Sequence, residues 1–158
     1  MDNQDSSILQ HSEMVEKFNE YFTSVFTVED PTSKPNPRVL FTGSENDKLK
    51  DIEIDEDMVK KKLDCIRTDK AAGFDGFSPR VLFELKDELC RPLTLIMNTS
   101  LNTGVVPDEW KAANVTPIHK KGNKGLVDNY RPISLTSLIC KLQESILRDA
   151  VVLHLENK

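Results

Sequence analysis

Five basic side chains gather in one short stretch of this sequence, between residues 111 and 131. They are Lys111, Lys120, Lys121, Lys124 and Arg131, and Asp128 is the only acid among them. Ammonium and guanidinium groups are the side chains that bind phosphate oxygens most strongly. On charge alone, however, a merely solvated loop explains the lysines equally well. A structural salt bridge would likewise account for Arg131.

The cysteines and histidines show no spacing that would support metal or nucleophilic chemistry. Cys65, Cys90, Cys140, His11, His119 and His154 are scattered along the chain. No pair has the spacing of zinc ligands, and no nucleophile stands near a base. We therefore predict three buried thiols, and solvated or core histidines at His11 and His154.

The acidic run Asp55-Glu56-Asp57 admits two interpretations. Three neighbouring carboxylates could hold a metal ion. They also suit the positive N-terminal end of a helix, and the helical pattern that follows favours this simpler explanation. We predict no metal site and no bound cofactor in this chain.

Composition indicates a folded protein without a membrane segment. The chain has 158 residues, a net charge of −5 and 38% hydrophobic residues, with no apolar run of about 20 residues that could span a bilayer. Residues 1–60 carry fourteen acids against six bases, which argues against nucleic-acid affinity of the whole protein. The start lacks a basic, apolar signal. We expect an intracellular protein, cytoplasmic or nuclear and not secreted.

Periodicity predicts a helix-rich α+β protein. Helices are expected over residues 11–26, 55–67 and 79–103, and after a cap at Thr136 or Ser137. Pro79 suits a helix start and Gly104 a helix end, whereas Pro92 should split or kink the helix that contains it. The apolar end of the last helix, residues 151–155, is of a type usually covered on every side.

The basic side chains fall between two predicted short strands. The strands lie near 113–119 and 131–135, and a flexible loop over 120–125 joins them. Residues 27–46 form a proline-containing linker, and residues 1–10 are expected to fray. Residues 70–77 read as a loop in which Gly73 and Gly76 permit positive φ.

Several motifs, in order, resemble one family. Lys70-Ala-Ala-Gly-Phe-Asp-Gly-Phe77 resembles the KxxGPDG loop of LINE-type, non-LTR, jockey-like reverse transcriptases, with Phe74 in place of proline. Leu101-Asn-Thr-Gly-Val-Val-Pro-Asp-Glu-Trp-Lys111 and Asn129-Tyr-Arg-Pro-Ile-Ser-Leu-Thr-Ser137, with Lys141 and Glu144, continue the pattern. The resemblance covers roughly residues 13–158.

The resemblance implies a partial right-hand polymerase fold, comprising the fingers and the first edge of the palm. It divides the chain into a linker helix region (1–26), a proline-containing linker (27–50) and a truncated reverse transcriptase domain (51–158). It also implies that Arg131 and Lys141 meet the triphosphate of a deoxynucleotide. Lys120, Lys121 and Lys124 would then lie near the RNA or DNA template or the nucleotide.

The sequence holds no Asp-Asp pair of the kind with which this family binds its two Mg²⁺ ions. We therefore predict no catalytic residue and a fragment that is inactive alone.

An alternative is a non-catalytic interaction module, or domesticated relic, that pairs with another copy or another chain through the palm edge and last helix. A monomer in light scattering would argue against this alternative. An enzyme of unrelated chemistry ranks last, because no cluster of titratable groups marks a site.

Overall fold

A computed structural model of the chain describes residues 11–27, 43–44, 47–49 and 51–157. The predicted fraying at 1–10 and most of the predicted linker at 27–46 lie outside these residues. The chain divides into two compact units. We name them the hairpin unit (described residues 11–27 and 115–133) and the helical unit (described residues from 43 to 114 and 134 to 157), and each is described by itself.

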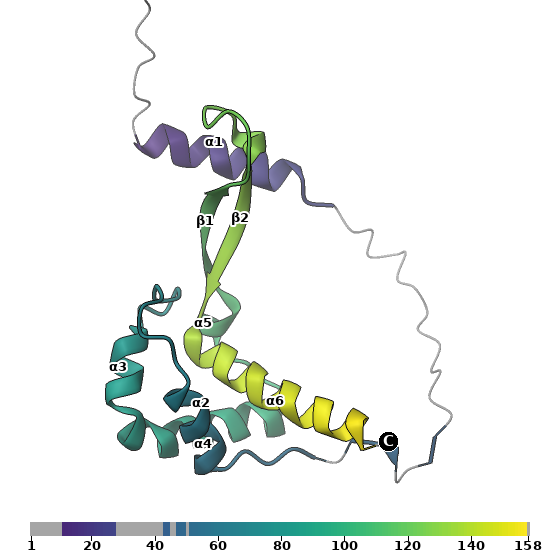
Figure 1. Cartoon of the computed structure of the whole chain (residues 1–158). Coiled ribbons are helices and arrows are strands. Elements are labelled where there is room, and N and C mark those ends of the chain that lie inside the picture. Colours follow the sequence, from purple (N-terminus) through teal and green to yellow (C-terminus); the bar gives the residue numbers. More distant parts are fainter. Residues whose placement is uncertain (1–10, 28–42, 45–46, 50, 158) are drawn as a thin grey trace, which may run out of the picture. The chain divides into compact units, whose positions relative to one another are not determined.

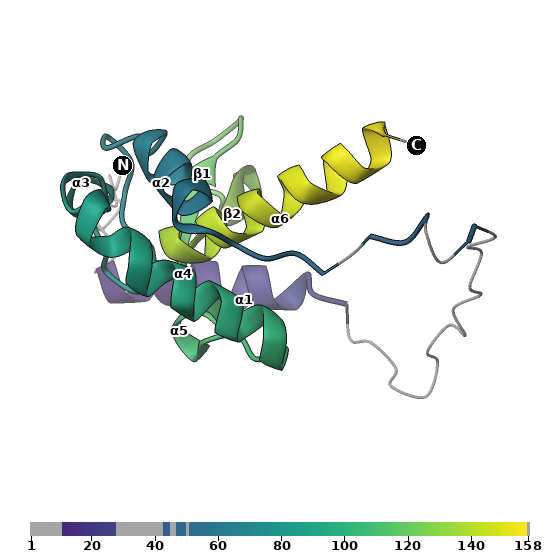
Figure 2. The same ribbon diagram turned by 90° about the horizontal axis from the view of Figure 1, so that it is seen from below.

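The helical unit is built on a core shared by three helices. Helix α2 (Glu56–Asp64) packs on both α4 (Lys86–Thr103) and α6 (Leu138–Glu156), as Figure 2 shows, and the shorter α3 (Pro79–Glu84) and α5 (Asp108–Lys111) complete the unit. Its buried apolar side chains come from these helices and from the segment before α2: Ile54, Val59, Leu63, Leu82, Cys90, Leu93, Met97, Ile139, Leu142 and Ile146. Burial of this apolar surface is the main force that holds the helices together.

Helix ends in the helical unit follow the expected signals. The Asp55 carboxylate accepts a hydrogen bond from the backbone N–H of Met58 at 2.7 Å, and the Ser137 hydroxyl accepts one from Cys140 at 3.2 Å. Pro79 is the first residue of α3, and Gly104 ends α4 with a φ of 69°. These caps confirm the helix starts predicted at Asp55, Pro79 and Ser137 and the end predicted at Gly104, whereas α2 ends at Asp64 and not at the predicted residue 67. They also give the acidic run at 55–57 a structural role.

The region 79–103 contains two helices, but they do not meet at Pro92. The break lies at Leu85, whose carbonyl oxygen accepts the backbone N–H groups of Glu88 and Leu89 at 3.1 and 2.9 Å. Pro92 lies inside α4 and is exposed. A helix starting at Lys86 places acidic residues in its first turn, where they suit the helix dipole, and the exposed proline costs it one backbone hydrogen bond.

The hairpin unit contains the other predicted elements. Helix α1 (His11–Ser24) lies beside the turn of a two-stranded antiparallel sheet made by β1 (Ala113–His119) and β2 (Tyr130–Thr136), with a 3-10 turn, η2 (Val127–Asn129), between the strands (Figure 1). The first residues of β1 (113–114) and the last residues of β2 (134–136) belong to the helical unit. Helices with one small sheet confirm the predicted α+β class.

Apolar side chains of α1 and α6 are less covered than their patterns predict. In α1, Phe22 is buried, whereas Met14 and Val15 are exposed. In α6, Leu153 and Leu155 are 61% and 66% exposed to solvent within the described part of the chain. None of the helices that the structure describes combines the length and the apolar character needed to cross a bilayer.

Candidate nucleic-acid interface

The loop that carries the lysines has a backbone held by its own hydrogen bonds. The N–H of Lys120 donates to the carbonyl oxygen of Asn129 at 2.7 Å, and the Asn129 side chain donates to the carbonyl of Asn123 at 2.8 Å. Gly122 has a φ of 84°, and a Cβ there would lie 2.9 Å from the Asn129 amide nitrogen. This glycine therefore meets both a backbone and a space requirement of the turn. These hydrogen bonds define the backbone path of the loop, and its flexibility stays a prediction.

An aromatic cluster fixes the base of this loop in the hairpin unit. The Tyr130 ring lies edge-on to Phe18 of α1 and to His119, with ring centroids 4.8 and 5.2 Å apart. The Tyr130 hydroxyl donates to the carbonyl of Lys124 at 3.0 Å, and Nε2 of His119 lies 3.2 Å from the carbonyl oxygen of Gly122. Edge-to-face aromatic pairs add modestly to the area they bury. They connect α1, β1 and β2 around the loop.

Four of the predicted site residues extend from this hairpin into solvent. Lys120, Lys121 and Lys124 lie on the loop and Arg131 lies on β2, and all four are exposed. Among the residues that the structure describes, their side chains form no ion pair with an acid and no hydrogen bond. A carboxylate partner would neutralise these cations and hold them in one geometry, so they remain open to an anionic ligand.

The fifth predicted residue, Lys141, belongs to the helical unit. It is exposed on α6, and its ammonium group donates to the carbonyl oxygen of Thr136 at 3.3 Å. The role that the resemblance gives it beside Arg131 stays a prediction, because the two residues lie in different units.

The cysteines and histidines take structural positions. Cys90 is buried and Cys140 half-buried, and burial is the main cause that raises the pKa of each thiol, with the Glu144 carboxylate adding to it at Cys140. Cys65 is exposed, so the prediction of a buried thiol there is wrong: α2 ends at Asp64, and Cys65 is its C-cap. His154 is half-buried, with Nε2 3.0 Å from the carbonyl oxygen of Asp47. The His11 side chain lies outside the described residues.

No group of His, Cys, Asp and Glu side chains able to hold a metal ion occurs within the described part of the chain.

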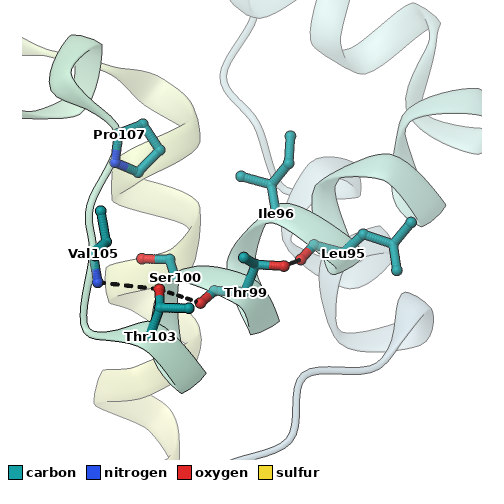
Figure 3. Close-up of a pocket in the computed structure, with 7 residues that line it drawn as sticks. All are labelled: Leu95, Ile96, Thr99, Ser100, Thr103, Val105 and Pro107. Atoms are coloured by element: carbon teal, nitrogen blue, oxygen red, sulfur yellow. Dashed lines mark hydrogen bonds between the residues drawn. The ribbon is translucent and has the colours of Figure 1, made fainter.

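A shallow hollow on α4 is lined by apolar side chains and hydroxyl groups and by no titratable side chain. Leu95, Ile96, Val105 and Pro107 line it together with a ladder of hydroxyl groups, in which Thr99 and Thr103 each donate to the carbonyl four residues earlier (Figure 3). These bonds satisfy the hydroxyls within the helix itself.

Sequence reasoning missed the side chains that organise the two loops. In the hairpin these are Asn123, Asn129 and Tyr130, which show no signal beyond the turn preference of asparagine. In the helical unit, the Ser137 hydroxyl donates to the Asp75 carboxylate at 2.6 Å, although 62 residues separate them. The sequence indicates only that Asp75 belongs to the predicted loop at 70–77.

Comparison with known proteins finds relatives of one class. No family model matches the chain. Three curated proteins that are similar to part of it are RNA-directed DNA polymerases of mobile elements, at 31–36% identity. The chain is thus related to part of the reverse transcriptases of non-LTR retrotransposons, as its motifs indicate.

Two of these relatives come from elements named jockey. The one from Drosophila melanogaster is 36% identical over 90 residues, or 56% of this chain, and the one from Drosophila funebris 32% over 95 residues, or 60%. A probable RNA-directed DNA polymerase from transposon BS of Drosophila melanogaster is 31% identical over 100 residues, or 63%. The chain spans about a tenth of the length of these relatives.

Proposed function

We propose that this chain supplies part of the fingers of a reverse transcriptase and contacts phosphate groups of template or nucleotide through its basic hairpin. The supporting observation is that the backbone of the loop is fixed while Lys120, Lys121, Lys124 and Arg131 stand exposed without acidic partners in the described structure. Homology to RNA-directed DNA polymerases supplies the ligand class. The partial polymerase fold is part of the same proposal.

The residue types suit this task. The guanidinium of Arg131 is a planar fork that can bind two phosphate oxygens, and Pro132 restricts its backbone to an extended path. The lysine side chains are flexible point charges that follow a phosphate chain without demanding one geometry. Lys141 would add a further cation from α6. Such contacts are electrostatic, so binding should weaken steeply as salt rises.

A titration of fluorescent single-stranded RNA at two salt concentrations tests the hairpin. The site variant changes Lys120, Lys121, Lys124 and Arg131 to Ala. A matched control changes four other exposed cations, Lys17, Lys61, Arg80 and Arg91, to Ala. We expect the site variant to lose at least about tenfold in affinity at low salt, and the salt slope to fall by as much as about 0.7 for each lost phosphate contact.

We also propose that residues 1–158 do not synthesise DNA by themselves. Nucleotide transfer in polymerases needs carboxylates that clamp two divalent ions, and the sequence has no Asp-Asp pair to do so. Mg²⁺ would be required by a full-length enzyme of this class. Primer extension on an RNA template with Mg²⁺ checks this, in parallel with a mock purification as control. Extension found in the purified protein and absent from the mock sample would contradict it.

A further inference from the structure

A second basic surface lies in the helical unit. It is a cleft of about 350 Å³ between the end of α2 with residues 65–70 on one wall and the first turns of α6 on the other. Five cations line it: Lys62, Arg67, Lys70, Lys141 and Arg148. Only Lys141 among them was predicted to bind a ligand.

Three of the five cations are already paired with carboxylates. Arg67 holds Asp69 through two hydrogen bonds of 2.8 and 3.2 Å. Asp149 accepts from Lys62 and, at 2.8 Å, from Arg148, and the Lys62 contact is the main reason that its pKa lies below the usual range. Since these pairs are satisfied, they define the edges of the cleft more than they attract a ligand.

The other two cations that line the cleft are Lys70 and Lys141. Both are exposed, and within the described residues neither ammonium group has a carboxylate partner. They line the same cleft from two different segments, one from the loop after α2 and the other from α6. Two cations of this kind attract an anion with more than one charged oxygen group.

The two walls are held together beside these lysines. The loop that begins at Lys70 approaches the start of α6 so closely that a Cβ on Gly73 would lie 2.4 Å from the carbonyl oxygen of Thr136. The fully buried Ser137 donates to Asp75 of the same loop at 2.6 Å and caps α6. The fold therefore fixes the backbone of the loop that begins at Lys70 against the start of α6, while the two lysine side chains themselves stay flexible. Holding the backbone segments in place lowers part of the entropic cost of binding.

We infer that this cleft is a second phosphate-binding site, in which Lys70 and Lys141 together bind a chain of two or more phosphates. Ile66, Leu138 and Leu142 also line the cleft and offer an apolar surface to a sugar or base. The inference rests on the proposed function for its ligand class. It assigns Lys141 a partner, Lys70, within the helical unit. The phosphates belong either to a nucleic-acid backbone or to a free nucleotide.

The test compares Lys70→Ala and the double variant Lys70→Ala/Lys141→Ala with a charge-matched control, Lys61→Ala/Arg91→Ala. Binding of a fluorescent single-stranded RNA and of inorganic tripolyphosphate is titrated for each, and circular dichroism checks that each variant is folded. We expect Lys70→Ala to weaken one or both probes about fivefold, and Lys70→Arg, which keeps the charge, to restore most of the loss. The responding probe identifies the source of the phosphates.

If Lys70→Ala binds both probes as the control does, the cleft is not a phosphate site. That result leaves the hairpin untouched, because the hairpin variant is measured separately. Loss in the cleft variants with an unaffected hairpin variant would instead refute the hairpin and support the cleft. Loss in Lys70→Ala that Lys70→Arg fails to restore would overturn the inference, because the effect would not follow the charge.

Discussion

The two units of this molecule use charge in opposite ways. In the helical unit, ion pairs join one helix to another: Lys60 to Asp87, Lys62 to Asp149 and Lys86 to Asp64. In the hairpin unit, the cations of the loop have no such partners among the described residues, and Phe22 is the buried apolar side chain. Packing maintains the helical unit, whereas hydrogen bonds shape the hairpin and leave its cations available.

The largest effect that separates the units is expected from core truncation. Leu63 of α2 is 0% exposed, and Leu63→Ala should lower the free energy of unfolding by about 2–5 kcal/mol, because it removes buried methyl groups and leaves a cavity. Ile133 of the hairpin is 44% exposed, and Ile133→Ala should cost less than about 1.5 kcal/mol. Urea denaturation followed by circular dichroism measures both. Equal losses of unfolding free energy in the two variants would contradict the distinction between a packed helical unit and a less packed hairpin unit.

A smaller effect is expected from glycine substitution. Gly73→Ala places a Cβ against the backbone of Thr136 and Ser137, and we expect a loss of about 1–3 kcal/mol as the loop is forced away from α6. Gly125→Ala is the matched change in the hairpin, where the nearest atom is the movable Asn123 side chain at 3.3 Å. It should alter stability by less than about 0.5 kcal/mol. A Gly73→Ala protein as stable as the parent would show that the close approach is not required.

Acid should produce the smallest effect, and only in the helical unit. Lys86 hydrogen-bonds Asp64 and Lys62 hydrogen-bonds Asp149, and each contact is the main cause of a lowered pKa. A lowered pKa in the folded state stabilises the fold above the unfolded value of about 3.9, and this contribution is lost as pH falls through the folded pKa. Asp64→Asn/Asp149→Asn should therefore melt below the parent at pH 7 and converge with it as acid protonates both carboxylates in the folded parent. Melting curves that stay parallel across this range would contradict the assignment.

Local signals in the sequence were sufficient for most of the helices and strands and for several of their ends. The cap at Ser137, the proline at Pro79 and the left-handed Gly104 each follow from the preferences of one residue for one backbone position. The strand at 113–119 was also located from its own residues. The position of the basic hairpin could be predicted because charge and strand pattern are both local properties of the sequence.

Features that depend on distant contacts could not be read in this way. Gly73 was predicted to permit positive φ, yet the positive-φ glycines of the described chain are Gly76, Gly104 and Gly122. The lack of a Cβ at Gly73 matters instead because Thr136 lies against it, and no local pattern indicates that approach. The break at Leu85 escaped notice for a related reason: a proline is a visible signal, but an exposed one can be tolerated inside a helix.

The central claim is that the unpaired cations of the hairpin are phosphate contacts. Its most direct test is the affinity for single-stranded RNA of the variant with Lys120, Lys121, Lys124 and Arg131 changed to Ala, measured beside the Lys17, Lys61, Arg80 and Arg91 control at low and high salt. We predict a loss of at least about tenfold and a flatter salt dependence in the hairpin variant alone. Equal affinities and equal slopes in the two variants would contradict the account.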